Sequence, residues 1–145
     1  MSTLSNAGKS ERVATQHLWW VTLAAIIIGM VGNLILYFIG RVVTGGLLIA
    51  FPNADATPMP LLLMLAATAV PGIVAVLIYV LLGRTGRPIT LFRVLALVVL
   101  LVSMAPLFQL PAAVTTANRI ILAIMHIWTA LVLAGMLTTF GRSRS

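Results

Sequence analysis

The sequence contains no cysteine. Without a thiol, the chain has no disulfide, no thiolate nucleophile, no cysteine-ligated zinc and no cysteine-bound iron–sulfur cluster. This absence excludes the membrane thiol oxidoreductases, which also use four-helix bundles.

Acidic residues are almost as scarce. Glu11 and Asp55 are the two in the chain, and 8% of all residues are charged, against about a quarter in a typical soluble domain. The motifs HExxH, GxGxxG, GxSxG and the P-loop are missing too. We therefore expect no enzyme, no catalytic residue, no metal and no cofactor.

The basic residues give a formal net charge of +7. They are spread over the chain without a dense run and without interleaved aromatic residues, so they do not resemble a nucleic-acid surface. We expect no nucleic acid as a partner, and membrane lipids, including anionic headgroups, as the nearest molecules.

Apolar sequence is abundant, at 61% of the residues. Four runs, at 18–39, 61–82, 89–108 and 119–140, are each about 30 Å long as a helix, which matches the hydrocarbon core of a bilayer. Short connections place consecutive helices side by side. The sequence predicts an all-α polytopic membrane protein, a four-transmembrane-helix up-down-up-down bundle.

The spans divide the chain into three parts. Residues 1–16 are expected to be a mobile cytoplasmic tail, residues 17–141 the transmembrane domain, and residues 142–145 a second cytoplasmic tail. The longest connection, 41–60, starts with the apolar segment Val42–Phe51. We expect this segment either to lie on the membrane surface or to re-enter the membrane.

The basic residues also predict the orientation of the bundle. Seven of the nine lie in the two tails, in the connection between the second and third runs, and at the start of the third run. By the positive-inside rule, this places both termini and that connection in the cytoplasm. An even number of spans requires both termini on one side, so the two arguments agree.

Each predicted helix carries a polar residue at a similar depth. Counted at about 1.5 Å per residue, these residues lie roughly 8–12 Å inside the outer ends of the spans. We take this polar layer as the candidate site: Asn33, Thr68, Ser103 and His126.

His126 is the strongest candidate because ionisable residues within spans tend to face the bundle interior and mark function. A neutral imidazole donates from one ring nitrogen and accepts at the other, which suits a metal or haem ligand, a proton relay or a ligand contact. The alternative is a structural histidine bonded to Asn33, Ser103 or Thr68. Asn33 is itself typical of interhelical hydrogen bonding, and Ser103 and Thr68 of bonding to their own helix.

Three further residues of the last run are candidates for an outer rim and ligand contact. Arg119 lies seven residues before His126 and shares its helical face, which Thr129 continues. Trp128 lies too deep for the interfacial aromatic belt, so it suits stacking on a flat ligand or packing in the core. For Arg119 the alternative is a solvated side chain.

A resemblance to a known family is carried by the segments Gly32–Tyr37, Arg93, Ser103–Leu107, Thr115–Arg119 and Leu122–His126. These segments are similar to a family of small four-span membrane proteins of unknown function that are common in actinobacteria. The resemblance covers most of the chain beyond the N-terminal tail, and it implies a bacterial plasma (inner) membrane protein whose Asn- and His-bearing helices are family features. It implies no activity, substrate or cofactor.

Three functions remain open. The first is a structural or accessory bundle that binds lipid or a partner, which the missing catalytic motifs favour. The second is a small-molecule binder or transporter using the polar layer; small multidrug exporters are similar in size and hydropathy, but they depend on a glutamate where this chain has Asn33. The third is a haem- or quinone-linked subunit using His126 and Trp128, for which a homodimer or a protein partner would supply the second haem ligand.

Overall fold

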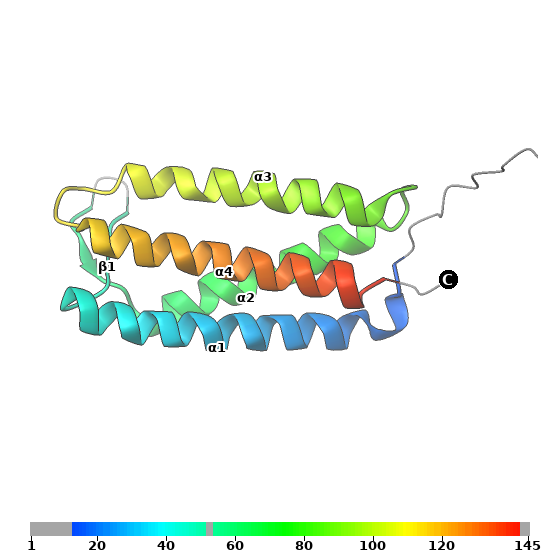
Figure 1. Cartoon of the computed structure of the whole chain (residues 1–145), viewed down its shortest axis with the longest axis horizontal. Coiled ribbons are helices and arrows are strands. Elements are labelled where there is room, and N and C mark those ends of the chain that lie inside the picture. Colours follow the sequence, from blue (N-terminus) through cyan, green and yellow to red (C-terminus); the bar gives the residue numbers. More distant parts are fainter. Residues whose placement is uncertain (1–12, 52–53, 143–145) are drawn as a thin grey trace, which may run out of the picture.

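The computed structural model describes residues 13–51 and 54–142, and four long helices make up most of it (Figure 1). They are α1 (Leu18–Thr44), α2 (Leu61–Leu82), α3 (Pro88–Phe108) and α4 (Thr116–Phe140). All four are long and apolar enough to cross a membrane, which confirms the predicted fold class. Most of the two expected tails, 1–16 and 142–145, is not described. Residues 1–12 of the first and residues 143–145 of the second lie outside the described residues.

The helices are not packed evenly around the bundle. The most extensive contact joins α1 to α4, while α3 packs mainly on α4 and α2 mainly on α1. Figure 1 shows that α2 and α3 meet at the end where the described chain begins and ends, at residues 13 and 142, and then separate toward the opposite end. Consequently α3 is the helix least covered by the others.

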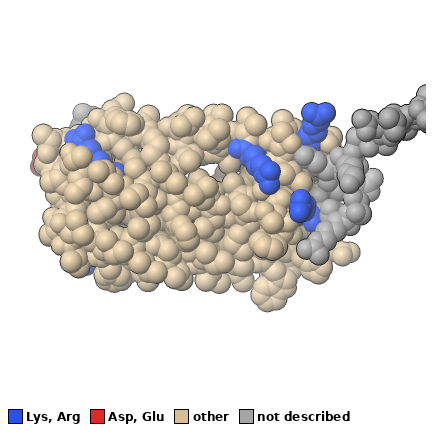
Figure 2. All heavy atoms as spheres, viewed as in Figure 1, with Lys and Arg blue, Asp and Glu red and all other residues tan. Residues whose placement is uncertain are grey.

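The two described chain ends pair with each other. The backbone N–H of Ala14 donates to the carbonyl of Gly141 at 2.8 Å, and Val13 and Arg142 form an isolated antiparallel bridge. The α2–α3 connection lies at the same end of the bundle (Figure 1). Basic side chains gather toward this end, and others lie at the far end of the molecule (Figure 2).

Residues 42–51 of the connection between α1 and α2 are divided among the end of α1, a turn and a short strand. Helix α1 continues through Thr44 and ends at Gly45, whose φ of 71° is readily accessible to glycine. The chain then turns inward, because Leu47 is 1% exposed and packs between the helices. Strands β1 (Leu48–Ile49) and β2 (Thr57–Pro58) pair antiparallel and close this end of the bundle.

Buried apolar side chains form one cluster at each end of the bundle. Tyr37, Met64 and Met125 belong to the cluster beside the β hairpin. At the other end, the Tyr79 and Phe92 rings meet edge to face, with 5.0 Å between their centroids, and join α2 to α3. The middle of the bundle, where α2 and α3 have separated, is left less filled.

Candidate functional site

A cavity of about 340 Å³ lies inside the bundle, between α2, α3 and α4. Its wall is almost entirely apolar, and α1 contributes Asn33 to it. Such a shape, an apolar body with a few polar groups, is typical of a small-molecule site. The divergence of α2 from α3 leaves this space, and small side chains keep it open: Ala67, Ala75, Ala96, Ala130 and Ala134.

The cavity is partly open to the surroundings of the bundle. Figure 2 shows a hollow near the middle of the face that α3 and α4 form, beside a basic side chain. Ala96 of α3 and Ala130 of α4 line the cavity and are too small to fill the seam between these two helices. In a membrane, such an opening faces the lipid chains, so a lipid-soluble molecule has a direct path into the cavity.

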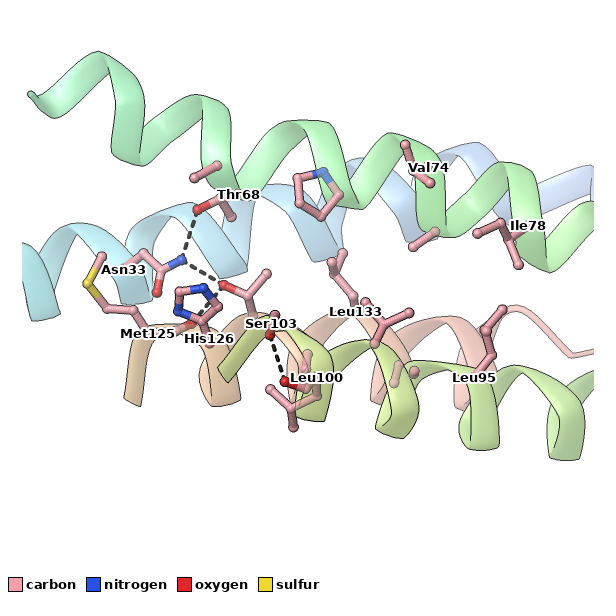
Figure 3. Close-up of a pocket in the computed structure, with 18 of the residues that line it drawn as sticks. Asn33, Thr68, Val74, Ile78, Leu95, Leu100, Ser103, Met125, His126 and Leu133 are labelled. Carbon is pink, nitrogen blue, oxygen red and sulfur yellow. Dashed lines mark hydrogen bonds between the residues drawn. The ribbon is translucent and has the colours of Figure 1, made fainter. Parts of the chain in front are cut away.

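Asn33 holds three helices together at one end of the cavity. It is 3% exposed, and its amide nitrogen donates to Thr68 Oγ1 of α2 at 2.8 Å and to Thr129 Oγ1 of α4 at 2.7 Å. Both bonds cross between helices, as expected for an asparagine inside a membrane bundle. Figure 3 shows this group of side chains beside the cavity.

The threonine hydroxyls determine how the Asn33 amide is turned. Thr68 Oγ1 donates to the carbonyl of Met64 at 3.1 Å, and Thr129 Oγ1 donates to that of Met125 at 2.9 Å. Each hydroxyl has one proton, so each can only accept from Asn33. The NH₂ group must therefore face the threonines, which leaves Asn33 Oδ1 buried and without a hydrogen-bond partner in the described part of the chain.

His126 lies on the cavity wall and is half-buried. Its Nδ1 is 2.8 Å from the carbonyl oxygen of Leu122, one turn earlier in α4. A carbonyl oxygen only accepts, so Nδ1 carries the proton, and Nε2 of the neutral ring is an acceptor. The histidine is thus held by its own helix and not by Asn33, Ser103 or Thr68, and within residues 13–51 and 54–142 no hydrogen bond occupies Nε2.

The structure brings the four residues of the predicted polar layer to one cavity wall. Ser103 completes it from α3, where its hydroxyl donates to the carbonyl of Leu100 at 2.7 Å. Thr129 lines the cavity as well. Counting depth along each helix was enough to group these residues, because all four helices run from one end of the bundle to the other, even though α2 is tilted (Figure 1).

Trp128 and Arg119 lie elsewhere. The indole of Trp128 packs against α1, where a Cβ at Gly32 would be 2.0 Å from its Nε1. The Arg119 guanidinium donates to the carbonyls of Leu110 at 2.7 Å and Val114 at 3.2 Å, so it holds the α3–α4 connection in place. The structure does not place either side chain on the cavity wall.

The apolar part of the cavity was not evident from the sequence. Its signal is the four-residue spacing of Ala130 and Ala134, which equally marks a close-packed helix seam. A second feature missed is the contact of Arg93 with α4, where Nε donates to Thr138 Oγ1 at 3.1 Å. The sequence does not predict that Thr138 accepts from Arg93, because a threonine within a helix typically donates to its own helix, as Thr138 also does to the carbonyl of Ala134.

The site has few groups for metal chemistry. Within the part of the chain that the structure describes, no three His, Cys, Asp or Glu side chains gather to hold a metal ion. On the described cavity wall, the neighbours of His126 are apolar or bear a hydroxyl, apart from the amide of Asn33. The chemistry available at this wall is hydrogen bonding and apolar contact.

Comparison with curated proteins and with solved structures finds no match. A family model does match, and it covers residues 13–143, which include all four helices and the whole polar layer. The predicted resemblance to a family of unknown function is therefore confirmed. The chain belongs to the family of unknown function DUF6069.

Proposed function

We propose that this protein binds a lipid-soluble small molecule in the cavity between α2, α3 and α4. The observation that carries the proposal is the cavity itself: about 340 Å³, apolar along its length and polar at one end. Cavities of this kind are the default binding sites of helical bundles. We place the protein in the bacterial plasma membrane, as a multi-pass protein with both termini in the cytoplasm.

The size of the cavity favours an occupant. In soluble proteins, an empty apolar cavity costs about 24 cal/mol for each Å³, so a space this large costs on the order of several kcal/mol when unfilled. This chain has alanine at five positions of the cavity wall. In a bundle selected for packing alone, we would expect larger side chains at these positions, because they would fill the space. A lipid or a lipid-soluble ligand removes this cost by occupying it.

The distribution of charge supports the orientation. Arg84, Arg87 and Arg142 lie at the bundle end where the described chain ends meet, and Arg93 lies in the second turn of α3. Arg41 and Arg119 lie toward the opposite end. The positive-inside rule therefore supports a cytoplasmic location for the end with the termini.

A structural or accessory role is the second candidate, and a different observation favours it. Asn33 ties α1 to α2 and α4, so the polar layer has a clear function in assembly alone. In that case the cavity would hold bulk lipid without selection, and the partner would be another protein. The two candidates differ in whether the cavity holds a defined molecule.

Native mass spectrometry of the protein, purified gently in a mild detergent, tests the proposal. We expect a bound molecule of defined mass that is lost in Ala130→Leu, because the added side chain projects into the cavity and narrows it. Ala105→Leu is the matched control, since Ala105 is exposed on α3 and is not on the cavity wall. Thermal unfolding of both variants shows that they are folded. A protein without adducts, or an adduct that survives Ala130→Leu and Ala105→Leu equally, would contradict the proposal.

A further inference from the structure

The hydrogen bonds around the cavity indicate which ligand chemistry it accepts, an inference that rests on the proposed function. We infer that the ligand is a neutral lipid with a free hydroxyl group, whose O–H donates to Asn33 Oδ1 or His126 Nε2 while its apolar chain fills the rest of the cavity.

The first step is to account for the protons at the polar end. Both amide protons of Asn33 go to Thr68 and Thr129. The hydroxyl protons of those threonines go to carbonyls of their own helices, and so does that of Ser103. The Nδ1 proton of His126 faces Leu122. Each polar side chain of the layer has thus directed its protons away from a ligand.

The second step concerns the acceptors that remain. Asn33 Oδ1 is buried and has no partner among the described residues, and His126 Nε2 has a free lone pair. Figure 3 shows the two side chains at the same end of the cavity, with the Asn33 oxygen on the side of the imidazole. A buried acceptor without a donor is unfavourable, so a molecule that brings an O–H here is favoured.

The third step excludes other headgroups. Ketones, aldehydes, esters and oxidised quinones have only hydrogen-bond acceptors, and these would lie against the acceptors Asn33 Oδ1 and His126 Nε2 of the protein. A carboxylate or phosphate finds no counter-charge, because the cavity wall described above has no Lys or Arg. An ammonium group finds no carboxylate on that wall, and an uncompensated charge is costly there. A hydroxyl brings the missing proton without a charge.

The fourth step is the length of the apolar part. The wall of α2 runs from Thr68 at the polar end to Ile78 at the other, about 15 Å at about 1.5 Å per residue, which is the length of an extended chain of about a dozen carbons. Phe92 and Leu95 of α3 line the far end. A linear alcohol of this length therefore fits with its hydroxyl at the polar layer.

The test compares 1-dodecanol with dodecyl methyl ether, which has the same chain but no donor. The two probes are offered together, at equal concentration, to the delipidated protein in detergent, and the adducts are measured by native mass spectrometry. We expect at least tenfold more alcohol adduct than ether adduct. In His126→Leu the ratio should fall several-fold, whereas Ala105→Leu, which changes an exposed residue of α3 that is not on the cavity wall, should retain it.

The outcomes separate this inference from the proposed function. Equal binding of alcohol and ether, with both lost in Ala130→Leu, would overturn the inference and leave the cavity as a site that does not recognise the headgroup; a water molecule that bridges the two acceptors gives this result. Binding of neither probe, together with no native adduct, would overturn both. If His126→Leu does not fold, the alcohol-to-ether ratio of the unmodified protein still decides whether the cavity prefers a ligand with a hydroxyl group.

Discussion

At the scale of single residues, depth along a helix was predictable and hydrogen-bond direction was not. The rise of a helix is constant, so Asn33, Thr68 and His126 could be assigned to one layer from their sequence positions. The acceptor to which each side chain donates its proton depends on neighbours from other helices and on carbonyls one turn away. The free acceptors at the cavity therefore could not be predicted from the sequence and follow only from the folded structure.

Trp128 shows the same limit for a large side chain. Its position indicated either ligand stacking or packing, and the deciding factor is a glycine on another helix. A Cβ at Gly32 would lie 2.0 Å from Nε1 and 2.2 Å from Cε2 of the indole, so Gly32 is what allows the ring to lie against α1. Sequence spacing within one helix carries no information about such a contact.

This contact predicts that Gly32→Ala is destabilising even though alanine is the better helix former. The methyl group must displace the indole, and overpacking of this kind typically costs about 1–3 kcal/mol. The free energy of unfolding, measured with denaturant in detergent, should fall by that amount, and Trp fluorescence should shift. The control is Gly135→Ala, because a Cβ there has open space, and we expect it to be neutral or stabilising. Equal effects of the two substitutions would refute the contact.

At the scale of the helices, the sequence predicted existence and type but misjudged two boundaries by several residues, the start of α4, which is Thr116 instead of residue 119, and the end of α1. Helix α2 begins and ends where the apolar run does, at Leu61 and Leu82. The first run was expected to end at residue 39, before Gly40 and Arg41, yet α1 continues to Thr44. Gly40 is a packing residue, since a Cβ there would be 3.1 Å from Ile121 and 3.2 Å from Leu47. A glycine that ends a helix and one that admits a neighbour look alike in sequence.

The association of the helices depends on Asn33, which predicts a measurable loss in Asn33→Leu. The variant removes two interhelical hydrogen bonds, and in membrane proteins each contributes about 0.6 kcal/mol on average and up to about 1.7. We expect the free energy of unfolding to fall by about 1–2 kcal/mol in a detergent titration. Ser103→Ala should change it by less than about 0.5 kcal/mol, because its bond stays within α3. If Ser103→Ala lowered the free energy of unfolding more than Asn33→Leu does, the interhelical hydrogen bonds of Asn33 would not be what stabilises the bundle.

At the scale of the whole molecule, the sequence predicted four helices and their up-down order but not the cavity. A helix that spans a membrane is apolar on every face. The hydropathy of a run therefore does not distinguish a face that contacts lipid from a face that lines an internal cavity. The divergence of α2 and α3 is a property of how helices pack. The same alanines that would close a seam between parallel helices line a cavity between diverging ones.

The orientation in the membrane is the last prediction, and the missing cysteine makes it simple to test. Because the natural chain has no thiol, any introduced cysteine is the sole target of a maleimide. Thr57, in β2, and Gly86, in the α2–α3 connection, are both exposed and lie at opposite ends of the bundle. In intact cells, a membrane-impermeant maleimide should label Thr57→Cys at once, and Gly86→Cys only after the membrane is permeabilised. The opposite pattern would place the termini outside, against the positive-inside rule, and would turn the polar layer toward the cytoplasmic leaflet.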